Sequence, residues 1–342
     1  MTYISRRQFT ARFLLTSATT LIYRGVRAAN FKLRQFHNQP ADSPLHKRLV
    51  EMWAAVKTET GGRVDVAIFA DNNQLPGSDP AALKMLLDGE LDFFTLNGGL
   101  IGTVVPAVNV QGLPFAFRDE AQVYRAIDGD LGEYLAKEMA AKGIYALPRS
   151  CFENGFRQIT CSVRPVRTAE DLNGIKMRTP DTPIYIECWR ALGATPVVFN
   201  FNKIYEALKT GQADAQDNPL NVAELLKLYE VQKYISLTNH IWSGFNLIAN
   251  LKMWQGLPSN VQRIIERNAE KYVKLQRNDT DKMNHDLPAR LTQRGMIINQ
   301  SDAASFRARL GGYYARWKDT LGSKTWALLE SHVGKLGPSV KA

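Results

Sequence analysis

Two arginines and one asparagine are the residues of this sequence best suited to bind a small anion. Arg157 and Arg178 lie 21 positions apart (178 − 157), and Asn218 follows in the segment ADAQDNPL. A guanidinium group donates two parallel hydrogen bonds to a carboxylate, and an amide can donate to one oxygen while accepting from a hydroxyl. This set predicts a pocket for a small carboxylate; the alternative is that the arginines are ordinary surface charges.

The local pattern places Arg178 at the end of a strand. In Gly174–Arg178 apolar and charged residues alternate, as in a strand that buries one face. Pro180 ends that strand, and a helix is expected over residues 184–192. Ligands of open α/β sheets bind at the carboxyl ends of strands, beside helix N-termini whose dipoles favour anions.

Asn218 reaches an equivalent position. A helix is expected over residues 203–209, Gly211 is typical of a helix C-cap, and the next strand should cover residues 213–217. Asn218 therefore falls just past the carboxyl end of a strand. The alternative is that the Asn-Pro pair forms a plain turn.

A weak internal repeat suggests a second lobe. Residues 82–94 and 205–216 share a helix, a capping glycine, an aspartate three residues later and a strand. Asn97 ends the strand of the first copy as Asn218 ends that of the second. Two similar α/β lobes, each presenting an asparagine, would face each other across a cleft.

Seven segments, in this order and spacing, make the chain resemble the extracytoplasmic solute-binding subunits of TRAP (tripartite ATP-independent periplasmic) transporters, the DctP-type proteins. The resemblance runs from about Phe31 to beyond Leu310. The segments are NNQLPG (72–77), LLDGELDF (86–93), GLPFAF (112–117), NGFRQIT (154–160), EDLNGIKMRTP (170–180), YEALKTGQADAQDNPL (205–220) and YEVQKYISLTNH (229–240).

The resemblance implies roles for individual residues. Arg178 matches the family arginine that pairs with the ligand carboxylate, and Arg157 matches the one that supports it. Asn218 matches the asparagine of a GQENP-like segment, which here reads AQDNP. Phe201 matches an aromatic residue that lies along the ligand.

Candidates from elsewhere in the cleft are His37, Asn97 and Trp242. His37 ends the first expected strand, where it would donate a hydrogen bond to the ligand or serve as a structural histidine. Trp242 would line an apolar part of the pocket. The loop QLPGSD departs from the commoner QLGxD of the family it resembles by an inserted proline, so Ser78 and Asp79 are left out of the candidate set.

The resemblance implies an α/β, two-lobed periplasmic binding protein, each lobe a mixed sheet flanked by helices. The first lobe would comprise residues 29–153 plus 243–283, and the second residues 154–242 plus 284–342. Strand crossings and a long spine helix, expected from Asn260 to about Leu287, would join them. A chain of 342 residues with 45% apolar content agrees with two lobes.

The N-terminus predicts export. Residues 5–10 (SRRQFT) fit a twin-arginine signal, residues 13–23 form an uncharged h-region, and residues 26–28 offer a cleavage site. The alternative is a general secretory signal; either route predicts a periplasmic protein with residues 1–28 removed. The leader holds five arginines and no acid, so the formal charge falls from +10 to +5 (10 − 5). The remaining charges are mixed, which argues against nucleic-acid binding.

The expected function is capture of a small organic carboxylate and its delivery to the small and large integral-membrane subunits of a TRAP permease. The protein should be a monomer without enzymatic activity, cofactor or metal. The sequence leaves mono- and dicarboxylates equally open. Two alternatives remain: the ligand-binding component of a membrane sensor, and an exported hydrolase in which Glu153 and Asp217 would form a carboxylate pair. Catalytic signatures such as G-x-S-x-G and H-E-x-x-H are absent from the sequence.

The three cysteines, Cys151, Cys161 and Cys188, lack metal-ligand spacing. They are expected to be small buried residues, and a disulfide between Cys151 and Cys161 is the alternative. No uncharged apolar stretch of about 18 residues occurs, so no membrane span is expected.

Overall fold

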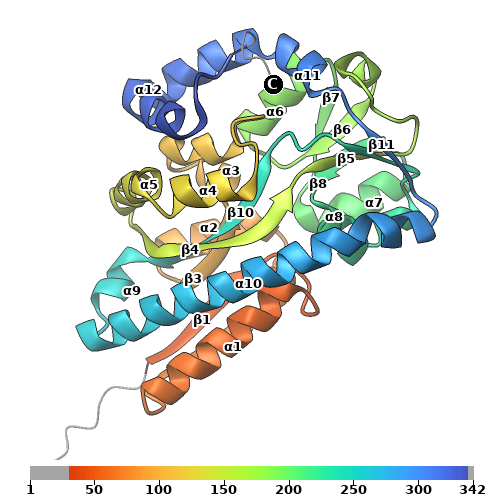
Figure 1. Cartoon of the computed structure of the whole chain (residues 1–342). Coiled ribbons are helices and arrows are strands. Elements are labelled where there is room, and N and C mark those ends of the chain that lie inside the picture. The colour runs from red at the N-terminus through yellow and green to blue at the C-terminus, as the bar shows by residue number, and fades with distance from the viewer. Residues whose placement is uncertain (1–30, 338–342) are drawn as a thin grey trace, which may run out of the picture.

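The computed structural model describes residues 31–337, and the predicted signal peptide lies outside them. Two mixed sheets, of five and six strands, are each flanked by helices and lie at opposite ends of the molecule (Figure 1). This arrangement confirms the predicted two-lobed α/β fold.

The first lobe is built on the five-stranded sheet, in which β1 pairs in parallel with β2 and β3 while β10 runs antiparallel to β3 and β4. The strands, in sheet order, are β2 (Val64–Phe69), β1 (Phe31–His37), β3 (Phe93–Asn97), β10 (Trp242–Asn250) and β4 (Ile144–Phe156). Its helices and 3₁₀ turns are α1 (Pro44–Glu59), η1 (Ala70–Gln74), α2 (Ser78–Asp88), α3 (Gly98–Ile101), η2 (Pro106–Gly112), α4 (Glu120–Ile127), α5 (Asp130–Ala140) and α9 (Leu251–Gln255).

The second lobe is built on the six-stranded sheet, in which β6 pairs in parallel with β7 and β8. The strands, in sheet order, are β11 (Ile297–Gln300), β9 (Tyr234–Leu237), β5 (Gln158–Cys161), β8 (Ala215–Asn218), β6 (Lys176–Thr179) and β7 (Thr195–Val198). Its helices and 3₁₀ turns are η3 (Ala169–Leu172), α6 (Pro183–Ala191), η4 (Phe201–Lys203), α7 (Ile204–Lys209), α8 (Leu220–Leu225), η5 (Leu228–Glu230) and α11 (Ala303–Arg309).

Three segments carry the chain between the lobes. Strand β4 is followed by β5 after the single residue Arg157, and β9 is followed by β10 after four residues, 238–241. The third is α10 (Ser259–Gln293), which packs on α1 of the first lobe and on α8 of the second and runs diagonally across the molecule (Figure 1). This helix matches the expected spine and continues through Pro288.

The C-terminal helix α12 (Gly311–Val333) contacts both lobes, although the sequence assigned it to the second. It packs against η2, α4 and α5 of the first lobe and α6 of the second. The helix breaks at Gly322, which has φ 79° and ψ 156°. A glycine adopts such positive φ values without the steric cost that other residues meet.

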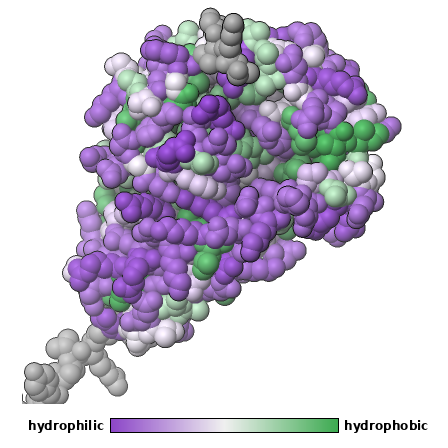
Figure 2. Space-filling model, viewed as in Figure 1, coloured by the Kyte–Doolittle hydropathy of each residue, from purple (hydrophilic) through white to green (hydrophobic). Residues whose placement is uncertain are grey.

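The cores form around the sheets, and the surface is largely polar. One buried apolar cluster joins the face of the first sheet under α2 to α5 with α6, α11 and α12, so it extends into both lobes. Figure 2 shows a mostly hydrophilic face with a hydrophobic area near β11, where Ile297 is 49% exposed. The three cysteines are buried and not joined in disulfides. No helix within residues 31–337 combines the length and apolar character that crossing a bilayer requires.

Candidate functional site

The predicted arginines and asparagines meet in one cavity between the lobes. It lies where the carboxyl ends of β1 and β3 face those of β6 and β8, as expected for ligand sites in α/β sheets. The lining residues come from both lobes and from the crossing strands: Asn38, Gln39, Asp79, Asn97, Leu100, Asn154, Arg157, Arg178, Pro180, Tyr185, Phe201, Asn218, Ser243 and Phe245.

Arg178 is a buried cation without a carboxylate partner among residues 31–337. Its side chain, at the end of β6, is 2% exposed, and its Nε and Nη2 donate to the backbone carbonyl of Phe199 at 2.9 and 2.6 Å. Burial and the neighbouring Arg157 charge lower the pKa of Arg178 to about 9, so the guanidinium is still protonated at neutral pH. Its Nη1 makes no hydrogen bond to the described residues. The guanidinium group is therefore held in place but still has donors free for a ligand.

Arg157 is already paired. Its Nε donates to Oδ2 of Asp217 at 2.5 Å, and its Nη2 donates to the Asp217 carbonyl at 2.5 Å. Burial alone would raise the pKa of Asp217, but the Arg157 charge and His240 together hold that pKa well below its usual value. Arg157 is thus fixed by an internal counter-ion, which suits a supporting role better than that of principal ligand cation.

His240 completes this network as a neutral imidazole. Burial lowers the pKa of His240 despite the nearby carboxylate. Its Nε2 lies 3.1 Å from Oδ2 of Asp217, and its Nδ1 lies 2.7 Å from the Thr238 hydroxyl. Because a carboxylate only accepts, the proton belongs on Nε2, and Thr238 donates to Nδ1. This partnership was not predictable from local patterns, since His240 and Asp217 are 23 residues apart.

Asn218 and Phe201 line the cavity beside the arginines. Asn218 is the last residue of β8, 4% exposed, and its Nδ2 donates to Gln216 at 2.7 Å. Its Oδ1 makes no hydrogen bond to residues 31–337, which leaves an acceptor for a ligand hydroxyl. Phe201 belongs to η4, which contacts α2 across the cleft.

Asp79, which the sequence left out of the candidate set, belongs to the cavity wall. It lies in α2, 4% exposed, and accepts from the amides of Asn38 at 2.9 Å and Asn72 at 2.8 Å. Burial raises the pKa of Asp79, while the two amides and the Arg178 charge oppose that rise. The inserted proline of QLPGSD therefore does not remove this carboxylate from the cavity wall.

His37 and Trp242 do not line the cavity. The Nε2 of His37 lies 2.9 Å from Nδ1 of His46, and its Nδ1 accepts from the Gln39 N–H at 3.3 Å. Burial, with a smaller effect from His46, lowers the pKa of His37 to about 3, so the ring is neutral. Both ring nitrogens are therefore used within the first lobe, which matches the structural alternative for His37.

Trp242 and Asn97 are held by protein partners. The Nε1 of Trp242 donates to both carboxylate oxygens of Glu153 at 2.9 Å. Asn97 does line the cavity, but its Oδ1 accepts from the N–H of Gly99 and its Nδ2 donates to the Ser243 hydroxyl at 3.1 Å. Asn97 thus caps α3 and ties it to β10.

The carboxylate pair that a hydrolase would require has separate partners. Glu153 accepts from Tyr124, Trp242 and the N–H of Gly155, whereas Asp217 accepts from Arg157 and His240. Glu153 does not line the cavity that holds the arginines. The two acids share no hydrogen-bond partner among the described residues.

Several wall residues were not among the predicted site residues. Asn38 and Gln39 directly follow β1, so their place at a strand end was a usable signal. Asn154 lies inside the motif that contains Arg157. Tyr185, in the first turn of α6, carried no signal, because an aromatic residue on a helix is more often part of a core.

A larger cavity of about 860 Å³ lies elsewhere in the first lobe, between α5, β4 and α10. Its walls are mainly apolar, and its charged residues are equally divided between acids and bases: Asp128, Glu133, Glu266, Glu270, Lys137, Arg149, Arg263 and Arg267. It contains none of the predicted site residues. The convergent buried charges favour the interlobe cavity as the ligand site.

Comparison with known proteins shows similarity to extracellular and periplasmic solute-binding proteins. The model of a family described as bacterial extracellular solute-binding protein, family 7, matches residues 36–320. The 2,3-diketo-L-gulonate-binding periplasmic protein YiaO of Escherichia coli is 30% identical over 257 residues, which cover 75% of this chain and 77% of that protein. The C4-dicarboxylate-binding periplasmic protein DctP of Rhodobacter capsulatus is 31% identical over 232 residues, 68% of each chain.

A solved structure supports the same assignment. The TRAP periplasmic solute binding protein from Chromohalobacter salexigens, with bound D-glucuronate, superimposes with a TM-score of 0.83 at 28% identity, covering 88% of this chain and 98% of that one. The predicted family is therefore confirmed: the chain belongs to family 7 of the bacterial extracellular solute-binding proteins, the DctP-type solute-binding proteins of TRAP transporters.

Proposed function

We propose that Arg178 receives the carboxylate of a small organic acid in the interlobe cavity. The observation that carries this proposal is the buried, protonated guanidinium of Arg178, which has no carboxylate partner among residues 31–337. A buried charge is costly unless it is paired, so a ligand carboxylate would relieve that cost. Arg157, held by Asp217, supports the same oxygen-rich end of the ligand.

The charge distribution favours a polyhydroxylated monocarboxylate, such as a sugar acid, over a dicarboxylate. Asp217 compensates Arg157, and the nearby Asp79 partly offsets Arg178. A second carboxylate would find no further cation in the cavity wall and would lie near Asp79. The relatives that bind D-glucuronate and 2,3-diketo-L-gulonate are consistent with this class.

The Asp79 carboxylate is proposed to accept hydrogen bonds from ligand hydroxyls. Asn38 and Asn72 each occupy one of its oxygens, and the remaining lone pairs can accept from a sugar hydroxyl. The amides of Gln39, Asn154 and Asn218 supply further polar groups in the wall. This places the hydroxyl-binding end largely on the first lobe and the carboxylate-binding end on the second.

A thermal-shift screen of organic acids tests the function. A ligand at 100 times its dissociation constant adds about 2.7 kcal/mol to the free energy of unfolding. We expect D-glucuronate or another sugar acid to raise the melting temperature more than succinate does. The neutral sugar D-glucose, which lacks a carboxylate, should leave it unchanged. No response to any acid would contradict the proposal.

Asp79→Asn is expected to weaken sugar-acid binding about tenfold or more, because a charge-assisted hydrogen bond contributes roughly 1.5–3 kcal/mol. Succinate should bind the variant as well as, or better than, it binds the native protein, since a nearby negative charge has been removed. Isothermal titration calorimetry measures both affinities. The control is Asp88→Asn, the same change at an exposed end of α2. Equal losses for both ligands would reject the hydroxyl-binding role.

Residues 1–28 are proposed to direct export, so that the mature chain works in the periplasm with TRAP permease subunits. The twin-arginine pair and the h-region of the sequence support this. N-terminal sequencing of the protein from a periplasmic extract should begin after Ala28. A chain retained in the cytoplasm with its first residues intact would contradict the assignment.

A further inference from the structure

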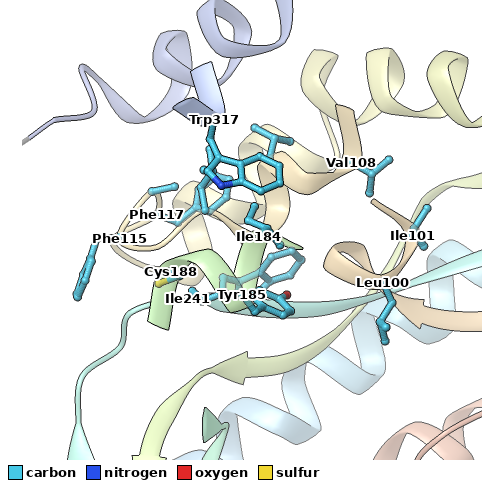
Figure 3. Close-up of a cluster of buried hydrophobic side chains, with 14 of the residues drawn as sticks. Leu100, Ile101, Val108, Phe115, Phe117, Ile184, Tyr185, Cys188, Ile241 and Trp317 are labelled. Atoms are coloured by element: carbon cyan, nitrogen blue, oxygen red, sulfur yellow. The ribbon is translucent and has the colours of Figure 1, made fainter. Parts of the chain in front are cut away.

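Tyr185 reaches from the second lobe into the first. It extends from α6, and its hydroxyl donates to Oδ1 of Asn97, at the end of β3, at 2.8 Å. Figure 3 shows the ring at the centre of the apolar cluster between the lobes, with its oxygen directed to the side on which Leu100 and Ile101 lie. The side chain is 2% exposed and also lines the ligand cavity.

The first lobe provides a close-fitting seat for this ring, made by two glycines. A Cβ atom added at Gly99 would lie 2.5 Å from the Tyr185 hydroxyl oxygen and 2.6 Å from Cζ. One added at Gly112 would lie 3.1 Å from Cε1. Real Cβ atoms do not approach other heavy atoms as closely as the Gly99 position would require. The seat therefore requires a glycine at position 99, and a side chain at position 112 would press tightly against the ring.

Tyr185 also contacts Arg157 of the ligand cavity. The Cζ atom of Arg157 lies 5.3 Å from the centre of the Tyr185 ring, within the range of a cation–π interaction. Burial, opposed by the Arg157 charge, raises the pKa of Tyr185 to about 12. The hydroxyl therefore keeps its proton and remains a donor to Asn97 throughout the physiological pH range.

We propose that Tyr185 is a positioning residue that latches the two lobes together over the ligand. Its hydrogen bond and its seat join residues of different lobes, so a movement that separates α6 from α3 would break both. An interaction found only in the closed state shifts the population towards that state and slows ligand release. The same ring supports Arg157, which links the latch to the carboxylate end of the cavity. This inference rests on the proposed function of acid binding.

Tyr185→Phe removes the hydroxyl alone. We expect the dissociation constant for D-glucuronate to rise about fivefold, which is the effect of one neutral hydrogen bond, mainly through faster dissociation. Stopped-flow kinetics separates the two rates. Tyr205→Phe is the control, because the Tyr205 hydroxyl on α7 donates to Glu230 of η5, a residue of the same lobe. The control should leave the dissociation rate unchanged.

Gly99→Ala tests the seat from the opposite lobe. The added methyl group should obstruct closure and lower D-glucuronate affinity more than Tyr185→Phe does. The melting temperature of the ligand-free variant should stay close to that of the native protein, because open lobes would hold Tyr185 away from position 99. Combining Gly99→Ala with Tyr185→Ala should restore closure, because the alanine at position 185 leaves room for the methyl group added at position 99.

Closure is measured by pulsed spin-label distances between Lys84→Cys on α2 and Lys209→Cys on α7, two exposed positions on different lobes. The native cysteines are buried. Distributions are recorded with and without D-glucuronate. With D-glucuronate bound, we expect the distance distribution of Gly99→Ala to shift towards longer distances than that of the native protein. The distribution of the double variant should return to the native one. Identical distributions for the native protein and Gly99→Ala would overturn the latch. Failure of D-glucuronate to bind or close the native protein would instead overturn the proposed ligand class.

Discussion

Arg178→Ala is expected to weaken acid binding by at least about 2 kcal/mol, or roughly 30-fold. The guanidinium is the one cation of the cavity wall that lacks a carboxylate partner within residues 31–337. The Phe199 carbonyl holds its Nε and Nη2, so the remaining donors are pre-oriented and little conformational freedom is lost when a carboxylate binds. Alanine would leave the ligand charge desolvated without a counter-ion.

Titration calorimetry with D-glucuronate measures this loss. Arg190→Ala is the control, because Arg190 is exposed on α6 and makes no ion pair with the described residues. Arg178→Lys is expected to recover only part of the affinity, since an ammonium group is a point charge that cannot bond the Phe199 carbonyl and grip a carboxylate as a fork. An unchanged affinity for Arg178→Ala would remove Arg178 from the proposed site.

The position of Arg178 was predictable because it depends on local patterns. The alternation of apolar and charged residues predicted the strand, and Pro180 predicted its end. Helix α6 begins within one residue of the expected start. Asn218 was placed by the same reasoning, and the structure makes it the last residue of β8. Such features depend on the period of the hydrophobic pattern and on the residue types at helix and strand ends, and both can be read from the sequence.

Contacts between distant segments were not predictable in this way. Tyr185 pairs with Asn97, 88 residues away, and its seat depends on the backbone of Gly99 and Gly112. Nothing in the local sequence distinguishes this tyrosine from an ordinary core residue. The partnership of Asp217 with His240 has the same origin, because it forms only when the six-stranded sheet is assembled.

The first lobe shows why a strand end is an incomplete signal. His37 does end β1, as expected, but its ring is bonded to His46 on α1. The next residue, Asn38, lines the cavity and binds Asp79 there. Because successive side chains of a strand point to opposite faces, an error of one residue exchanges a cavity position for a core position.

Asp217→Ala is expected to lower the free energy of unfolding by about 3–5 kcal/mol, because removing one partner of a buried ion pair leaves the other charge uncompensated. Arg157 would lose the carboxylate that accepts the hydrogen bond from its Nε. The uncompensated charge of Arg157 would then lie near a second buried cation, Arg178. The His240 N–H would also lose its acceptor. Urea denaturation of the ligand-free protein measures the change. Asp65→Ala is the control, since Asp65 forms an exposed ion pair with Lys57 whose loss should cost at most about 1 kcal/mol.

The destabilisation by Asp217→Ala should depend on pH in a defined direction. The folded protein holds the pKa of Asp217 below its ordinary value of 3.8, so the ionised carboxylate stabilises the fold above about pH 4. As the pH falls below that value, the unfolded chain takes up a proton that the folded chain resists, and the stabilisation is progressively lost. The difference between native protein and variant should therefore be constant from pH 5 to 8 and shrink in acid, to roughly the scale of a lost packing contact. A difference that is independent of pH down to the acid limit would mean that Asp217 acts through packing and not through its charge, and Arg157 would then need another counter-ion.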